Sequence, residues 1–168
     1  FTFLTNLGFR VIISDKSTRK TYEKGMESMP SESVCYPAKL SHGHVISLIQ
    51  KGIKTIFYPC MPYSRKEYQD ANNRYNCPIV ISYSEVLKNN VEELKTENID
   101  FRNPFLSFEN VEILEKRLSE EFNNIPSSQV KAAVKDAWNE LMQSKEDIHK
   151  KGEEVIKYLD ETGKRGIV

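Results

Sequence analysis

Three cysteines are the residues best suited to chemistry, because each has a proline within two positions. They stand in the stretches Cys35-Tyr36-Pro37, Pro59-Cys60-Met61-Pro62 and Asn76-Cys77-Pro78. A cysteine that only packs needs no such neighbour, since a buried thiol behaves as a small hydrophobic side chain. Proline fixes φ and removes an N–H donor, and iron–sulfur sites can carry proline beside a ligating cysteine. Cys35, Cys60 and Cys77 are therefore candidate ligands of a metal or cluster.

The spacing of the cysteines keeps other interpretations open. No two of them form a CxxC pair, so the compact zinc and ferredoxin motifs are absent from the sequence. Spacing alone favours thiols without a metal. A structural zinc site ranks below both a cluster and a metal-free scaffold, because the common zinc motifs need closer ligand pairs.

The histidines carry a weaker signal. His42 and His44 are two residues apart, and side chains at that spacing on a helix point to different faces. We expect surface or capping roles for them rather than a shared metal. His149 lies in a charged stretch near the C-terminus, where we expect it to be solvated.

Two polar segments could bind an anion. Ser31-Glu32-Ser33 precedes Cys35 and could hold an anion or cap the next helix. The long polar stretch 61–77 carries four side chains that could contact a phosphate-bearing ligand: Tyr63, Arg65, Lys66 and Tyr68. Basic residues in loops are usually only solvated, so the phosphate interpretation is the less common one.

Strand-like and helix-like stretches alternate along the chain and must position these residues. Short apolar runs predict strands at 9–14, 55–58, 78–82 and between 99 and 106. Helical spacing and punctuation predict helices at 18–29, 37–52, from a capping box at 82–85, around 111–118, and from 127 to about 158. The alternation favours an α/β fold with a mainly parallel, Rossmann-like sheet flanked by helices and a long C-terminal helix.

The predicted topology separates the three cysteines. Ligands of parallel sheets gather at the carboxyl edge of the strands, and Cys60 follows the 55–58 strand. Cys35 precedes the start of a helix. Cys77 directly precedes the predicted 78–82 strand, which assigns it to the opposite edge and makes it the doubtful ligand.

Composition excludes several classes of protein. The 168 residues carry 24 Lys plus Arg and 24 Asp plus Glu, without the basic excess of a nucleic-acid-binding protein. No apolar run approaches a membrane span, and no signal-peptide pattern is present. Three cysteines are far fewer than a disulfide-stapled secreted domain carries, so we expect a cytoplasmic location.

The sequence holds no complete catalytic machinery. GxxxxGK[ST], GxGxxG and GxSxG patterns are all missing, so catalytic and cofactor-binding residues stay unassigned. The chain has no initiator Met, and its closing Gly166-Ile167-Val168 resembles the start of a strand. We therefore expect residues 1–168 to be a single α/β domain cut from a longer multidomain protein.

The motifs around the cysteines resemble one protein family. The resemblance is carried by Ser31-Glu32-Ser33-Val34-Cys35-Tyr36-Pro37-Ala38-Lys39-Leu40, Phe57-Tyr58-Pro59-Cys60-Met61-Pro62-Tyr63, Tyr75-Asn76-Cys77-Pro78-Ile79-Val80, Asn6-Leu7-Gly8-Phe9-Arg10 and Gly163-Lys164-Arg165-Gly166-Ile167-Val168. These segments are similar to the domain of unknown function in bacterial 2-hydroxyacyl-CoA dehydratase activase-related proteins, also called CoA-substrate-specific enzyme activases. The resemblance spans essentially the whole chain.

The resemblance implies a function in anaerobic metabolism. Distant relatives of the domain are dehydratase and benzoyl-CoA reductase subunits, whose cysteines hold a 4Fe–4S cluster. Cys35 and Cys60 match the two early ligands of those subunits. Their third ligand lies much further along the chain, so Cys77 or a residue beyond Val168 would complete the set here.

The implied role is relay of low-potential electrons toward activation of an acyl-CoA-type substrate. The implied partners are an ATPase module of the parent chain and an acyl-CoA dehydratase or reductase. The parent would be an ATP-dependent activase or reductase. The alternative that needs no metal is a non-catalytic α/β scaffold or interaction domain.

Overall fold

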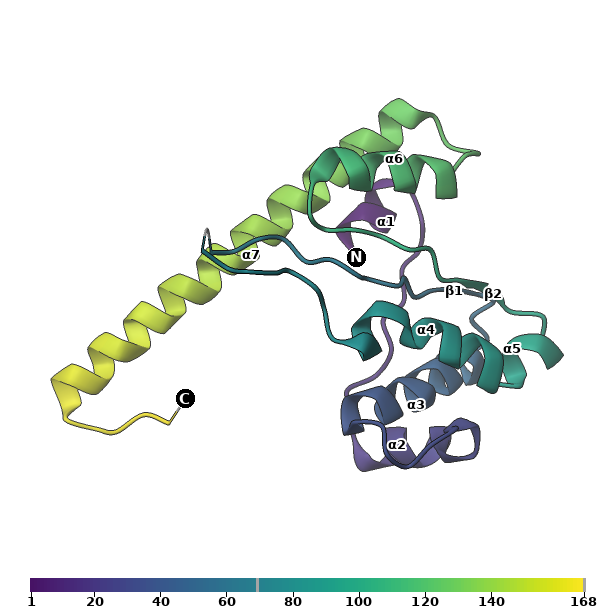
Figure 1. Cartoon of the computed structure of the whole chain (residues 1–168), viewed down its shortest axis with the longest axis horizontal. Helices are drawn as coiled ribbons and strands as arrows, with labels where there is room; N and C mark the ends of the chain where they lie inside the picture. The colour runs from purple at the N-terminus through teal and green to yellow at the C-terminus, as the bar shows by residue number, and fades with distance from the viewer. Residues whose placement is uncertain (69, 168) are drawn as a thin grey trace. The chain divides into compact units, whose positions relative to one another are not determined.

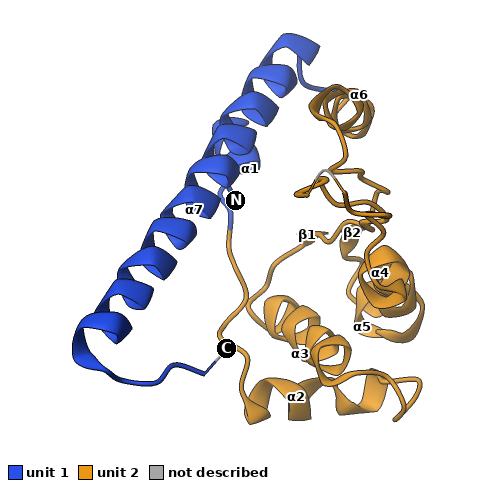
Figure 2. Cartoon of the chain, turned by 60° about the vertical axis from the view of Figure 1, so that its left-hand side comes forward, with its two compact units in different colours: residues 1–11, 124–168 blue, residues 12–123 orange. Residues whose placement is uncertain are grey.

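The computed structural model describes residues 1–68 and 70–167, and the chain divides into two compact units (Figure 2). Unit 1 joins residues 1–11 to residues 124–168, and unit 2 comprises residues 12–123. The three cysteines all belong to unit 2. That residues 1–168 act as one domain of a longer protein stays a prediction.

Unit 2 contains most of the secondary structure, which Figure 1 labels along the chain. Its elements are α2 (Arg19–Gly25), the 3-10 turn η1 (Met26–Ser28), α3 (Tyr36–Gln50), β1 (Thr55–Phe57), α4 (Pro78–Asn90), α5 (Glu93–Thr96), β2 (Asp100–Arg102) and α6 (Val111–Glu121). The fold is thus mixed helix and sheet. The predicted helices at 18–29, 37–52 and 111–118 and the predicted strands near 55–58 and 99–106 are confirmed.

The sheet is smaller than the sequence predicted. β1 and β2 pair in parallel, with Ile56 opposite Phe101, and the described residues contain this two-stranded sheet alone. A single-residue bridge between Cys60 and Phe105 continues the pairing past the strand ends. A full Rossmann-like sheet is therefore not formed by the described part of the chain.

Two predicted strands are wrong. Residues 9–14 form no strand, and Ile13 is 67% exposed. Residues 78–82 form the first turns of α4, so the predicted capping box at 82–85 lies inside that helix. The run Ile79-Val80-Ile81 has high strand propensity, but proline is favoured in a first helical turn. Burial of Tyr83 and Leu87, four residues apart, then favours the helix.

The core of unit 2 forms between the helices and the strand pair. Its contiguous buried set is Ala38, Val45, Ile46, Ile49, Ile56, Tyr83, Leu87, Val91, Leu94, Ile99 and Phe101. Members come from α3, β1, α4, α5 and β2, so the core joins elements distant in sequence. This cluster fixes α3 and α4 beside the strands, and thereby positions the helix ends that carry Cys35 and Cys77.

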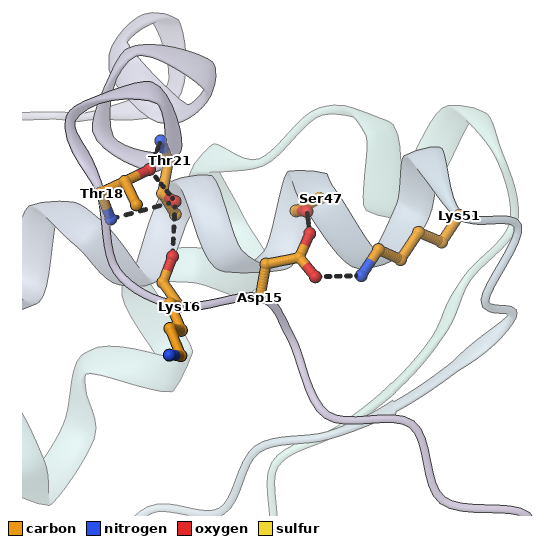
Figure 3. A network of polar contacts seen from close by, with 6 residues as sticks. All are labelled: Asp15, Lys16, Thr18, Thr21, Ser47 and Lys51. Atoms are coloured by element: carbon orange, nitrogen blue, oxygen red, sulfur yellow. Dashed lines mark hydrogen bonds and ion pairs between the residues drawn. The ribbon is translucent and has the colours of Figure 1, made fainter.

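The first residues of unit 2 are tied to α2 and α3 by polar contacts (Figure 3). The Lys51 ammonium donates to Asp15 Oδ1 at 2.6 Å, and the paired cation lowers the pKa of that carboxyl. Thr18 caps α2 by accepting from the Thr21 N–H at 3.2 Å. The Thr21 hydroxyl donates to the Lys16 carbonyl at 3.1 Å. These bonds anchor residues 15–21, which directly follow the predicted strand at 9–14.

Unit 1 consists of two helices, α1 (Thr2–Asn6) and α7 (Ser127–Thr162). The two are joined by an Asn6 Nδ2–H donated to Asp136 Oδ2 at 3.0 Å. Gly163 ends α7 in the left-handed region at φ 66°, where glycine has no Cβ clash. The predicted long C-terminal helix is confirmed. The predicted closing strand is not: Gly166 and Ile167 are unassigned, and Val168 lies outside the described residues. None of the helices in the described ranges is long and apolar enough to span a membrane.

Candidate functional site

Cys60 lies just past the carboxyl end of β1, as predicted. Its N–H donates to the Pro104 carbonyl at 2.9 Å, and its own carbonyl accepts from the Leu106 N–H at 2.9 Å. The side chain is fully buried, and Sγ lies 2.8 Å from the Ser84 hydroxyl on α4. Backbone pairing and the serine contact together hold this sulfur in a single position at the edge of the sheet.

Cys35 is the N-cap residue of α3, with Pro37 in the first turn. This confirms its predicted place before a helix N-terminus. Its side chain is exposed and makes no capping hydrogen bond. The thiol therefore faces solvent beside free backbone N–H groups, which favour negative charge at a helix start.

Cys77 is the N-cap residue of α4, with Pro78 as the first helical residue. The prediction that it precedes a strand was wrong, and with it the assignment to the opposite edge. A helix that connects two parallel strands runs back against them, so its N-terminus lies toward the carboxyl edge. The Met61 N–H donates to the Val80 carbonyl at 3.2 Å and joins the segment after Cys60 to the first turn of α4. Cys77, which is exposed, thus belongs to the same edge as Cys60.

A buried chain of polar groups lies beneath this edge. His42 is fully buried; its Nδ1 lies 2.8 Å from the Ser28 hydroxyl and its Nε2 lies 3.0 Å from the Tyr83 hydroxyl. The Ser28 hydroxyl donates its only hydrogen to the Gly25 carbonyl. Its oxygen must therefore accept a hydrogen bond from His42 Nδ1–H. Nε2 is then the acceptor for the Tyr83 O–H. The surface role that we predicted for His42 is wrong.

Burial keeps the His42 imidazole and the Tyr83 hydroxyl neutral. Desolvation lowers the pKa of His42 from 6.5 to about 4. Burial also raises the pKa of Tyr83, and the nearby charges that Cys35 and Tyr58 can carry raise it further. Tyr58 is 36% exposed, so its burial is only partial; that partial burial raises its pKa, a hydrogen bond with Ser41 lowers it in part, and Cys60 raises it again. Both tyrosines are therefore uncharged at neutral pH; Cys35 acts on the pKa of Tyr83, and Cys60 acts on the pKa of Tyr58.

The connection 61–77 is a loop, as predicted, and it is closed on itself. An antiparallel bridge pairs Tyr63 with Tyr75, and Arg74 forms an ion pair with Glu109. Asn76 Nδ2 donates to the Met61 carbonyl at 2.8 Å, and its Oδ1 accepts from Ser64 Oγ at 2.8 Å. This brings the residues next to Cys60 and Cys77 together at the base of the loop.

The anion-binding candidates stay predictions. Lys66 and Tyr68 are exposed, and Arg65 is half-buried. Ser31 and Ser33 share a hydrogen bond of 2.8 Å between their hydroxyls, within their own turn.

The other two histidines stay outside this edge. His44 lies 2.9 Å through Nε2 from the Ser17 hydroxyl. His149 is exposed, as predicted.

The three cysteines match the ligand type of a metal or cluster site but not its geometry. The three thiols are the ligand type that iron–sulfur clusters use, and all belong to one edge. Yet within residues 1–68 and 70–167 no three His, Cys, Asp or Glu side chains converge into a group that could hold one metal ion. The donors therefore fit in kind, but they do not form a ready-made ligand set.

Sequence reasoning missed the polar residues near the cysteines, of which Ser84 contacts Cys60 directly: Ser28, His42, Tyr58, Tyr83 and Ser84. The spacing of Tyr83 and Leu87 could have indicated a helix, and thus a buried Tyr83 facing α3. No local signal pairs His42 with Tyr83, because their contact spans 41 positions.

Comparison with known protein families identifies the family of the chain. Residues 1–168 match the family described as CoA enzyme activase uncharacterised domain. The chain belongs to this family. The match extends over both compact units of this CoA enzyme activase domain and confirms the resemblance drawn from the cysteine motifs. No curated protein and no solved structure matches the chain significantly.

Proposed function

We propose that this CoA enzyme activase domain binds an iron–sulfur cluster at the carboxyl edge of β1 and serves electron transfer toward an acyl-CoA-type substrate. Cys35 and Cys60 are the principal ligands in this proposal, and Cys77 is the third. The proposed partners are an ATPase module and an acyl-CoA dehydratase or reductase.

The single observation that carries the proposal is the shared edge. Three cysteines from separate segments lie at the start of α3, the end of β1 and the start of α4. Parallel sheets collect their ligands at this edge. Two of the thiols adjoin helix N-termini, which favour the anionic ligands that a cationic iron site needs.

The cluster chemistry is limited to what the thiols can supply. When bound, a cluster of this type supplies one-electron transfer, with a potential tuned by hydrogen bonds to its sulfurs and by burial. The Ser84 hydroxyl beside Cys60 is one such hydrogen-bonding group. Because the thiols do not converge into a ligand group, loading requires them to approach one another.

Anaerobic reconstitution of the chain with iron and sulfide tests the proposal. Visible absorbance, electron paramagnetic resonance and the iron content per chain report the cluster. We expect the unsubstituted chain to bind a cluster and the variants Cys35→Ser and Cys60→Ser to lose it. Cys77→Ser weakens binding if Cys77 is the third ligand.

Two controls make the result decisive. Ser33→Ala changes an exposed turn residue beside Cys35 and should leave cluster binding unchanged. Metal content of aerobically purified protein reports the zinc alternative. The proposal is overturned if reconstitution gives no cluster absorbance. It is also overturned if Cys35→Ser and Cys60→Ser bind as much cluster as the unsubstituted chain.

A metal-free scaffold is the second candidate, and the packing of Cys60 favours it. A fully buried thiol within 2.8 Å of a buried serine hydroxyl already has a packing role. On this proposal Cys60→Ala lowers the free energy of unfolding by about 1–2 kcal/mol. The exposed Cys35→Ala and Cys77→Ala change it by less than about 0.5 kcal/mol, and none of the three binds iron.

A further inference from the structure

The loop that follows Cys60 carries an aromatic pair that the cluster proposal does not use. Tyr63 and Tyr75 oppose each other in an antiparallel bridge, and their ring centroids lie 4.8 Å apart. Backbone hydrogen bonds on either side of the bridge, both 3.0 Å long, hold this register. Residues paired between two such bonds bring their side chains closest together. The backbone therefore keeps the two rings in contact, and we call this pair the tyrosine platform.

The tyrosine platform is open to solvent on one side. Tyr75 is 63% exposed, although Tyr63 lies against one side of its ring. Nucleobases stack on exposed tyrosine rings because every base has a π-face. A tyrosine ring held by paired backbone offers such a surface without having to be ordered on binding.

Arg65 supplies a second and independent observation, a buried donor without an acceptor. Its Nε is buried and has no hydrogen-bond partner within residues 1–68 and 70–167. The one other buried nitrogen of this kind in those residues is His44 Nδ1. An imidazole nitrogen can exist without a hydrogen, whereas arginine Nε always carries one. Because an unpaired buried donor is costly, Arg65 Nε points to an acceptor supplied by a ligand.

The charge of Arg65 favours an anionic acceptor. The nearby Arg74 is already paired with Glu109, so its guanidinium is not free to neutralise a ligand. Arginine binds phosphate through two parallel N–H groups, which gives geometric specificity as well as charge. A phosphate group therefore satisfies both the charge of Arg65 and its unpaired donor.

Strand geometry relates Arg65 to the tyrosine platform. Arg65 stands two positions after Tyr63, and alternate residues of an extended strand share a face. Two residues span about 7 Å along a strand, a separation that the ribose of a nucleotide can bridge between base and phosphate. Lys66, the next residue, belongs to the opposite face by the same alternation.

We propose that this part of the loop binds a nucleotide, with the base stacked on Tyr75 and a phosphate bonded to the Arg65 guanidinium. The site follows Cys60 at the carboxyl edge of β1, where parallel sheets bind their ligands. A free adenine nucleotide and the nucleotide portion of coenzyme A share this chemistry. The inference goes beyond the proposed function, because nucleotide binding is measured on protein prepared without iron and does not depend on a cluster.

Isothermal titration calorimetry of the full chain with ADP tests the inference. We expect saturable binding with a dissociation constant below about 1 mM, and weaker binding of inorganic phosphate, which cannot stack. Arg65→Gln should raise the dissociation constant for ADP by about tenfold or more, because it removes the charged, two-pronged donor. Lys66→Gln is the matched control: it removes the same charge from the adjacent exposed residue and should change the constant by less than about threefold.

Substitutions of Tyr75 test the stacking separately from the charge. Tyr75→Leu should weaken ADP and leave the weak binding of inorganic phosphate unchanged, whereas Tyr75→Phe keeps the aromatic face and should retain ADP. Arg65→Lys keeps the charge without the fork and should recover part of the affinity. Circular dichroism and thermal unfolding check that each variant is folded.

Titration with coenzyme A distinguishes the two sources of the nucleotide. Binding at least about tenfold tighter than ADP, and weakened by the same variants, assigns coenzyme A; equal binding assigns a free nucleotide. The inference is overturned if neither ADP nor coenzyme A binds, or if Arg65→Gln and Lys66→Gln have equal effects. It is also overturned if folded Tyr75→Leu binds ADP as the unsubstituted chain does, or if a single-stranded oligonucleotide binds more tightly than either ligand.

Discussion

His42 accounts for much of the polar chemistry in the core of unit 2. It is fully buried, and its two ring nitrogens face the hydroxyls of Ser28 and Tyr83. The Ser28 hydroxyl donates to the Gly25 carbonyl, so the direction of each hydrogen bond among Ser28, His42 and Tyr83 is fixed. A histidine satisfied in this way holds α3 to α4 beneath the cysteine edge without carrying a charge.

The neutral state of His42 predicts an acid-dependent loss of stability. Its pKa is lowered from 6.5 to about 4, so the unfolded chain takes up a proton first as the pH falls. The stabilisation is complete above about pH 6.5 and is lost between pH 6.5 and 4, by roughly 3 kcal/mol. Urea unfolding at several pH values measures it.

The control for this prediction is His42→Gln, which should flatten the slope in that window. His44, whose pKa is also lowered by burial, leaves a residual slope. Asp15 acts in a separate, more acidic window, because its pKa lies below 3.8. An unchanged slope in His42→Gln contradicts the assignment.

The Tyr83 hydroxyl should contribute to stability through its bond to His42. Tyr83→Phe leaves the buried Nε2 without a donor, which costs about 1–2 kcal/mol of unfolding free energy. The matched variant Tyr68→Phe alters a tyrosine that is 76% exposed and should change stability by less than about 0.5 kcal/mol. Chemical denaturation at neutral pH compares the two, and equal effects would count against the buried hydrogen bond.

At the scale of elements, two glycines allow α2 and α3 to cross at close range. A Cβ added to Gly43 would lie 1.6 Å from the Thr21 carbonyl oxygen, and one added to Gly25 would lie 2.4 Å from the Gly43 nitrogen. Both neighbours are backbone atoms that no side-chain rotation can move. The crossing also brings the Gly25 carbonyl and Ser28 to His42, so helix packing and the polar chain depend on each other.

Gly43→Ala should therefore destabilise unit 2 although alanine is the better helix former. We expect a loss of about 3 kcal/mol, at the upper end for overpacking. Gly152→Ala is the matched control, because nothing lies within 4 Å of its added Cβ, and it should raise stability by about 0.5–1 kcal/mol. Thermal unfolding of both variants decides, and a neutral Gly43→Ala would disprove the close contact.

At the scale of the whole molecule, the charges balance. The chain carries 24 basic and 24 acidic side chains, and many pair locally on the helices, as Lys151 does with Glu154. A molecule without net charge lacks the long-range repulsion that keeps proteins apart in solution. Exposed apolar side chains on α7, among them Ile148, Val155 and Ile156, add apolar surface to that molecule.

The solubility of the chain should consequently be lowest near pH 7, its sequence isoelectric point, and should rise toward pH 9. Precipitation by polyethylene glycol at a series of pH values measures this. The variant Ile148→Glu should shift the minimum to lower pH, since it adds an acidic group. A solubility that does not depend on pH would show that surface charge is not the controlling term.

Local sequence was sufficient where one residue dominates the backbone. Pro37 marks the start of α3, and Gly163 with its positive φ ends α7. The strand at 55–57 follows from its apolar run. At 78–82 the same reasoning failed, because a run of β-branched residues and a leading proline support different structures and only burial of Tyr83 and Leu87 favours the helix.

The family, the helices marked by proline or glycine, and the interest of the three cysteines follow from the amino-acid sequence. Tertiary contacts were needed to establish that Cys77 starts a helix and shares the edge with Cys60, that His42 is buried, and that the thiols of the described residues do not converge into a ligand group. The physical reason is the range of the forces involved. Proline and glycine act on their own φ and ψ, whereas burial depends on partners such as His42 and Tyr83, which are 41 positions apart.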